Sequence, residues 1–221
     1  MEQAIARVTL TVALIGTLAT AASAASETDR LLLELRVVTH EALDAADLQV
    51  ARQTAAALLA SAGIQIVWRE CGAIDNPLDE SDGLPFVLVH LFPNMKSSDR
   101  SMSGEATRGT GTGIPVALVY VARNEELVQT FRRTSAGRSN PALTTLTTGH
   151  LVGFTIAHEV GHLLGLHHAS VGLMRAQLTP EDIVALRTSG LAFLAEECQR
   201  MRHTLNSDAA PRFAASRTAA R

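Results

Sequence analysis

The first predicted element is a strand at residues 30–40, RLLLELRVVTH. Apolar and polar side chains alternate there with the period of two that is typical of a half-buried strand. One face would carry Leu33, Leu35 and Val37, and the other would carry Glu34, Arg36 and Val38. We therefore expect only the first face to lie in the core.

An amphipathic helix is predicted next, at residues 44–63, because its apolar positions recur three and four residues apart. Asp44 is a candidate N-cap, and Gly63 can end the helix in a left-handed conformation. Three shorter β-rich segments follow, at residues 64–71, 85–92 and 115–122. The last two are apolar on both faces, as expected for strands that are covered on both sides.

A polar segment, residues 96–113, separates the last two of these strands. It is too rich in Gly, Ser and Thr to pack, so we expect a loop that holds one short edge strand around Gly104 to Arg108. A second polar connector, residues 132–149, leads into a helix that carries several histidines and begins near Thr147.

The C-terminal part predicts one last long helix. Residues 178–201 offer Thr179 as the N-cap and Pro180 at the first helical position. From about Met201 the chain is rich in Ala, Arg, Ser and Pro, and we expect a flexible polar tail over residues 201–221.

The composition indicates one globular domain rather than disorder. The chain has 221 residues, of which 47% are hydrophobic and 19% charged, and its net charge is -3. The C-terminal arginines have no aromatic interleaving beyond Phe213 and belong to no nucleic-acid-binding motif. We therefore expect no nucleic-acid partner.

Residues 1–24 have the pattern of a signal peptide. A short start ending in Arg7 precedes an apolar stretch, and the small residues 22–24 form an A-x-A cleavage site. The alternative is an uncleaved membrane anchor, but Thr and Ser dilute the stretch, and a spanning helix needs about 20 mostly apolar residues. We expect a secreted or periplasmic protein with no stable membrane span after cleavage and a folded domain at residues 25–200.

The chain contains two cysteines, Cys71 and Cys198. An oxidising compartment favours their pairing, so export predicts a disulfide between the second strand and the last helix. Two separate buried thiols are the alternative.

The most informative stretch is residues 154–168, FTIAHEVGHLLGLHH, which holds four of the 8 histidines. His158 and His162 are four residues apart, so both imidazoles lie on one face of a helix and can bind one ion. Glu159 flanks this pair and can accept a proton from a metal-bound water. The apolar residues Val152, Ile156, Val160 and Leu163 would pack on the opposite side.

A third ligand requires the chain to turn back after the helix. Gly165 permits such a turn, and His168 follows it by three residues. His167 is the competing candidate. We expect structural roles for His150 and His90, and a core position for Trp68.

HEVGHLLGLHH resembles the metzincin metalloprotease signature HExxHxxGxxH at each specified position, and TPEDIVAL resembles the start of the C-terminal helix in matrixin-like members. The resemblance implies that His158, His162 and His168 bind one catalytic zinc ion and that Glu159 is the general base. It also implies a methionine turn beneath the metal, for which Met174 is the candidate.

The implied fold is of the α/β (α+β) class and covers roughly residues 30–200. It is a metzincin-like zincin fold, with a mixed twisted sheet of about five strands, a central zinc-binding helix and a C-terminal helix. The closest placement is a small secreted bacterial-type protein.

The expected function is that of a secreted zinc-dependent endopeptidase. Zinc would activate a water, Glu159 would act as general base, and a protein or peptide substrate would add as a strand to the edge near Gly104 to Arg108. The alternative is a non-proteolytic zinc-binding recognition or adhesion module on the same fold. A membrane-anchored structural protein would not explain the histidines. Substrate, cleavage specificity, metzincin branch and oligomeric state stay open.

Overall fold

A computed structural model describes residues 31–40, 42–72, 83–94, 102–108, 113–134 and 138–207. The signal peptide expected at residues 1–24 lies outside the described residues, as does the end of the tail, 208–221. Within the described part the protein is mixed α/β, with five strands in one sheet and six helices. None of these helices is both long and apolar enough to cross a membrane.

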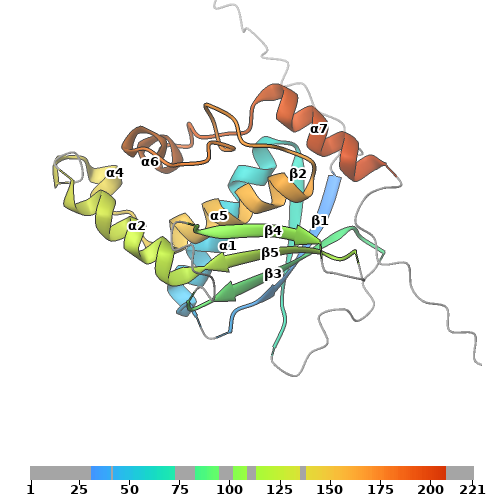
Figure 1. Cartoon of the computed structure of the whole chain (residues 1–221), viewed down its shortest axis with the longest axis horizontal. Helices are drawn as coiled ribbons and strands as arrows, with labels where there is room; N and C mark the ends of the chain where they lie inside the picture. The colour runs from blue at the N-terminus through green and yellow to red at the C-terminus, as the bar shows by residue number, and fades with distance from the viewer. Residues whose placement is uncertain are drawn as a thin grey trace, which may run out of the picture.

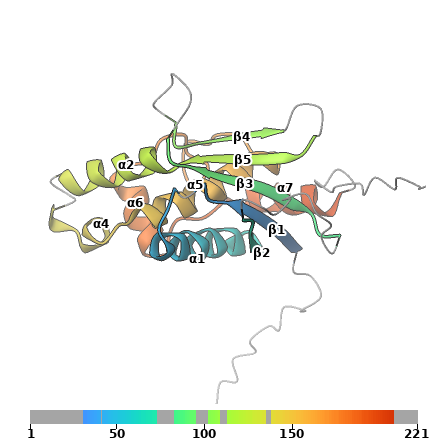
Figure 2. The same cartoon turned by 90° about the horizontal axis from the view of Figure 1, so that it is seen from below.

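The sheet has the strand order β2-β1-β3-β5-β4. Neighbouring strands are parallel except for β4, which pairs antiparallel with β5. The strands are β1 (Leu31–Val38), β2 (Ile64–Glu70), β3 (Phe86–Phe92), β4 (Gly104–Arg108) and β5 (Pro115–Tyr120). The edge strand expected at Gly104 to Arg108 is therefore confirmed (Figure 2).

Two long helices pack against each other on one face of this sheet (Figure 1). They are α1 and α5, and α5 also lies against β4 and β5. The helices are α1 (Ala45–Ser61), α2 (Val121–Arg133), α4 (Pro141–Thr144), α5 (Thr148–Leu163), α6 (Pro180–Arg187) and α7 (Ala195–Asn206).

The contact between α1 and α5 depends on two glycines. A Cβ on Gly149 would lie 2.3 Å from the carbonyl oxygen of Asp47, and one on Gly153 would lie 2.5 Å from that of Ala51. Because no side chain separates the two backbones there, α5 lies deep in the protein, and most of its residues are buried.

Both helices have the expected boundaries. The Asp44 side chain caps α1 by accepting from the backbone N–H of Asp47, and Gly63, at φ 78°, follows its end. At the start of α5 the Thr147 N–H donates to Nδ1 of His150 over 3.1 Å. His150 Nε2 contacts Arg187, so His150 has the structural role that we expected.

Strand β1 differs from the prediction, because its polar face is buried as well as its apolar face. The Glu34 and Arg36 side chains are 1% and 2% exposed and form an ion pair 3.1 Å apart. Arg69 on β2 lies 2.6 Å from the same carboxylate, and the Arg36 guanidinium stacks 4.1 Å over the Phe86 ring. Two arginines thus compensate the buried Glu34 carboxylate, which the pattern alone would place in solvent, and the Phe86 ring covers one of them.

Helix α2 was not predicted, and residues 121–122, expected at the end of a strand, form its first turn. Tyr120 precedes it without a side-chain cap, so no local signal marks its start.

The prediction of one last long helix is also wrong, because this segment forms two helices, α6 and α7. After α6 the chain turns at Ser189, whose φ is 58°, and at Gly190, and helix α7 begins at Ala195. Helix α7 then continues past Met201 to Asn206, with Leu205 buried, so the expected tail starts later than predicted.

The predicted disulfide does not form, and both cysteines are thiols. The Cys198 sulfur lies 4.0 Å from the Ser61 carbonyl oxygen, just before β2 begins, whereas Cys71 follows the other end of β2. A strand of 7 residues spans about 20 Å, and a disulfide requires Cα atoms about 4.4–6.8 Å apart. The length of β2 therefore separates the two residues.

His90 and Trp68 are not part of the group formed by His158, His162 and His168. His90 is partly buried on β3, 2.9 Å from the His40 ring nitrogen, and it stacks with Phe92. Trp68 was expected in the core but is only partly buried against it.

Candidate metal centre

Three histidines meet at the C-terminal half of α5. The Nε2 atom of His162 lies 3.1 Å from that of His158 and 3.2 Å from that of His168. In the described part of the chain this is the group of His, Cys, Asp or Glu side chains that could hold a metal ion, and its ligand atoms lie within 4.8 Å of one another. His167, the competing candidate, is not part of it.

The turn that brings His168 back begins at Gly165. Its φ of 89° lies in the left-handed region, which glycine adopts without strain. The Leu166 N–H donates to the Gly161 carbonyl over 3.0 Å, and the Gly165 N–H donates to the His162 carbonyl over 3.0 Å. This pair of hydrogen bonds is a Schellman ending, which reverses the chain within a few residues.

Backbone carbonyls orient two of the three imidazoles. His158 Nδ1 lies 3.0 Å from the Leu173 carbonyl oxygen, and His162 Nδ1 lies 3.0 Å from that of Leu166. A carbonyl oxygen can only accept, so each Nδ1 must carry the proton. The Nε2 lone pairs of the neutral rings therefore point toward one another, as is usual for histidines that bind metals.

Burial keeps these rings neutral. It lowers the pKa of His158 to about 4, helped by His162 and His168, although the hydrogen bond to Leu173 opposes the shift. Burial also lowers the pKa of His162. Metal binding requires deprotonated ligands, and at His158 and His162 no proton has to be removed at neutral pH.

The donor set fits a small tetrahedral ion. Nitrogen ligands about 2.0–2.1 Å from one ion at tetrahedral angles would be about 3.3 Å apart. The observed separations of 3.1 and 3.2 Å are close to this value. Without a cation, the Nε2 lone pairs of His158 and His162 would repel each other at 3.1 Å. The arrangement therefore favours a bound cation.

Met174 packs against α5 at Gly161, the residue before His162. It is fully buried, and a Cβ on Gly161 would lie 2.7 Å from its sulfur. Its carbonyl oxygen accepts from the Ala169 N–H over 2.9 Å, which closes the turn after His168. The segment that carries Met174 thus also supplies the carbonyl that holds His158.

Glu159 is buried on the same helix, beside the histidines. Burial raises the pKa of its carboxyl group to about 8, and Glu105 on β4 adds to the shift. A cation nearby would favour the charged form. Gly104 allows β4 to approach this carboxyl group, because a Cβ there would lie 2.8 Å from Glu159 Oε1 and 2.5 Å from Thr155 Cγ2.

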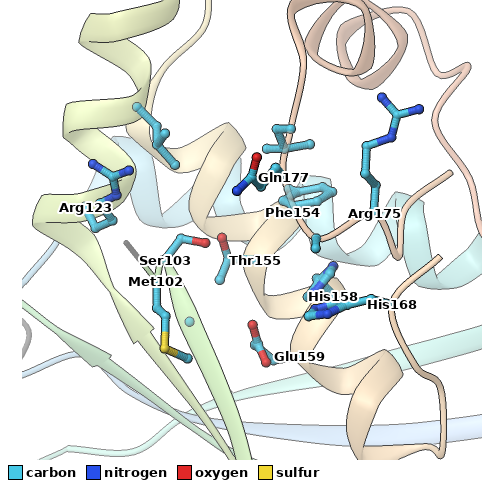
Figure 3. Close-up of a pocket in the computed structure, with 14 residues that line it drawn as sticks. Met102, Ser103, Arg123, Phe154, Thr155, His158, Glu159, His168, Arg175 and Gln177 are labelled. Atoms are coloured by element: carbon cyan, nitrogen blue, oxygen red, sulfur yellow. The ribbon is translucent and has the colours of Figure 1, made fainter. Parts of the chain in front are cut away.

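A pocket of about 460 Å³ opens beside Glu159 and the histidines (Figure 3). Its walls come from α5, the start of β4, helix α2 and the segment after Met174. The lining includes His158, Glu159, Thr155, Phe154, Gly104 and Leu127. The edge strand, the Glu159 carboxyl group and two of the three histidines, His158 and His168, therefore share one cavity.

A buried polar contact that sequence analysis missed joins these walls. Asn124 on α2 donates to the carbonyls of Tyr120 over 2.9 Å and Ser103 over 3.3 Å, and it accepts from the Thr155 hydroxyl over 2.9 Å. It thus connects the segment before β4 to the helix turn that precedes Glu159. Sequence analysis missed Asn124 because it did not predict α2, the helix that carries this residue.

Comparisons with known proteins leave the family undecided. No protein-family model matches the sequence, and no curated protein is significantly similar to it.

Proposed function

We propose that the protein is a zinc-dependent endopeptidase related to the metzincins. The observation that carries the proposal is the convergence of three Nε2 atoms, at separations of 3.1 and 3.2 Å, beside a pocket that His158, His168 and Glu159 line. The HExxHxxGxxH pattern, the buried Met174 against Gly161 and the antiparallel edge strand support the same family.

His158, His162 and His168 would hold the zinc ion. Three histidines and an open fourth position are typical of catalytic zinc sites. When bound, zinc makes a water more acidic and polarises the carbonyl of the peptide bond.

Glu159 would receive the proton of the attacking water and return it to the departing amine. Its carboxyl group is suited to this role because it lies beside the three histidines and is not needed as a metal ligand. Its apolar surroundings and the elevated pKa make it a stronger base than an exposed carboxylate once it is ionised.

Strand β4 would align the substrate. It pairs with β5 on one side, and it ends the sheet on the other. An extended peptide can therefore add to its outer edge, where it would cross the pocket next to Glu159. We further propose export, which the signal-peptide pattern at residues 1–24 supports.

The test is metal analysis of the purified protein together with digestion of a broad peptide library, run beside Glu159→Ala. We expect about one zinc per chain and cleavage by the wild type. The variant should keep its zinc and lose at least about 10⁴-fold in rate, since general-base catalysis contributes about 10² to 10⁴ and this group also orients the nucleophile.

Two results would contradict the proposal. Wild-type protein that carries zinc and cleaves nothing would instead favour a zinc-binding recognition module. Undiminished cleavage by Glu159→Ala would exclude Glu159 as the base.

A further inference from the structure

The pocket beside the histidines carries an uneven charge. Much of its wall is apolar, with Leu127, Phe154 and Leu178 on three different segments. The two cations that line it are Arg123 on α2 and Arg175 after Met174, on opposite sides of the cavity (Figure 3). Glu159 is the one carboxyl group among the described lining residues.

The charge of Arg175 is already compensated. Its Nη1 lies 3.1 Å from the Asp182 carboxylate, and its Nε donates to the Ser170 carbonyl over 3.0 Å. Asp182 also accepts from the backbone and hydroxyl of Thr179 at the start of α6. Arg175 therefore belongs to a structural network, and a ligand would have to compete with a largely buried carboxylate for it.

The charge of Arg123 is compensated much less. Its partner is Glu126, 3.0 Å away and 66% exposed, one turn along the same helix. Exposed pairs of this kind are weak because water screens them. The Nε–H of Arg123 is buried and has no hydrogen-bond partner in the described part of the chain. The guanidinium is thus a cation at the pocket wall with little to hold it in its present arrangement.

We propose that Arg123 selects substrates that place a carboxylate in this pocket, so that the protein cleaves peptide bonds next to aspartate or glutamate. This inference rests on the proposed peptidase function. A carboxylate can accept two hydrogen bonds from a guanidinium, and the apolar walls of the pocket strengthen that interaction. The volume of about 460 Å³ accommodates a glutamate side chain.

The first test compares peptides that differ at one residue beside the cleaved bond. A library digest locates the bond and the side of it that shows selectivity, and Glu, Gln, Leu and Lys are then placed at that position. We expect kcat/KM for the Glu peptide to exceed that for the Gln peptide by about tenfold or more at low salt. The ratio should fall as salt is added, because salt screens an interaction between charges.

Substitution of Arg123 provides the second test. Arg123→Gln should bring the Glu/Gln ratio close to one, and Arg123→Glu should reverse the preference in favour of the Lys peptide. Arg133→Gln is the matched control, since Arg133 is an exposed cation at the other end of α2. That variant should retain the wild-type ratio. Arg123→Lys, which keeps the charge, serves if Arg123→Gln does not fold, and it should retain part of the preference.

Equilibrium binding separates this inference from the peptidase function. Binding of the labelled Glu and Gln peptides to the zinc-loaded full chain is measured by fluorescence anisotropy. If no peptide is cleaved but the Glu peptide binds at least about fivefold tighter in an Arg123-dependent way, carboxylate recognition stands and the peptidase function fails. If peptides are cleaved but Leu is preferred to Glu, or Arg123→Gln leaves the ratio unchanged, the peptidase function stands and this inference is overturned. Equal binding of both peptides also overturns it.

Discussion

The two halves of helix α5 are held in the protein by different kinds of contact. The N-terminal half meets α1 at Gly149 and Gly153, where any side chain would collide with backbone atoms. The C-terminal half carries His158, Glu159 and His162. Hydrogen bonds to backbone carbonyls hold the two imidazoles, and Met174 packs against Gly161 on the same turn. The first half is specified by shape and the second by polar contacts.

This difference indicates that stability and chemistry can be changed separately along one helix. Overpacking the glycine half should loosen the fold without altering the donor atoms. Removal of a ligand should greatly weaken metal binding at little cost to the stability of the metal-free protein. The predictions that follow test this separation, beginning with the largest expected effect.

Replacing His168 should weaken metal binding and hardly change the stability of the metal-free protein. The side chain is exposed, so His168→Ala loses little packing but removes one of three donor atoms. We expect zinc affinity to fall by at least about 100-fold, more than the loss of a supporting hydrogen bond causes. His167→Ala is the control, since His167 is also exposed and lies next to it in sequence. Zinc titration of both variants checks this, and loss of zinc from His167→Ala instead would reverse the ligand assignment.

Adding one methyl group to β4 at Gly104 should reduce activity by displacing the strand or the Glu159 carboxyl group. In Gly104→Ala the new Cβ would lie 2.5 Å from Thr155 Cγ2 and 2.8 Å from Glu159 Oε1, so the strand must move or the carboxyl group must turn. A displacement of about 1 Å near reacting groups can cost about 100-fold, and we expect kcat/KM to fall by about 10- to 100-fold. Zinc content should not change. Gly190→Ala, whose Cβ would find its nearest neighbour at 3.7 Å, should behave like wild type.

In the glycine half the same kind of change should reduce stability instead. A Cβ at Gly153 would lie 2.5 Å from the Ala51 carbonyl oxygen and 2.7 Å from Thr54 Cβ, so α1 and α5 must separate. Overpacking costs about 1–3 kcal/mol, and the higher helix propensity of Ala offsets about 1 kcal/mol of it. We expect Gly153→Ala to lower the free energy of unfolding by up to about 2 kcal/mol in urea titrations. The folded variant should bind zinc as wild type does, and weaker binding would show that the two halves are coupled.

The smallest effect concerns pH and His150, at the N-terminus of α5. Burial lowers the pKa of His150 to about 4, helped by Arg187 and opposed by Asp47. Between pH 6.5 and about 4 the unfolded chain therefore binds a proton that the folded protein does not. The resulting stabilisation is complete above pH 6.5 and is lost as the pH falls toward 4.

His150→Gln can still accept from the Thr147 N–H, but it does not titrate. Its free energy of unfolding should fall less than that of wild type between pH 7 and 5, because the other histidines are common to both proteins. If the free energies of unfolding of the two proteins changed in parallel with pH, His150 would not have a lowered pKa in the folded protein.

The sequence predicted best those features that depend on neighbouring residues. Asp44 and Gly63 bounded α1, and Thr147 marked the start of α5, because caps act on the backbone within a few positions. The three histidines were identifiable because a helix and one glycine turn bring them together.

Features that depend on distant segments were missed. The buried charge of Glu34 is compensated by Arg69 from another strand, which a period-two pattern cannot show. Cys71 and Cys198 could be counted but not placed, and the length of β2 keeps them apart. Arg123 lines the pocket from α2, which itself had no local signal.

The hydrogen bond from His158 to the Leu173 carbonyl links metal binding to the stability of the segment that follows α5. A metal held by His158, His162 and His168 would act as a cross-link between α5 and the following segment, and Leu173 is in turn bonded to Ala192. Metal at about 100 times its dissociation constant stabilises a folded state by about 2.7 kcal/mol. Chelation should therefore speed amide hydrogen exchange first in the turn that contains Met174, while the contact between α1 and α5 stays protected. In this protein the ion would determine how firmly the segment from His168 to Ala192 is attached to α5.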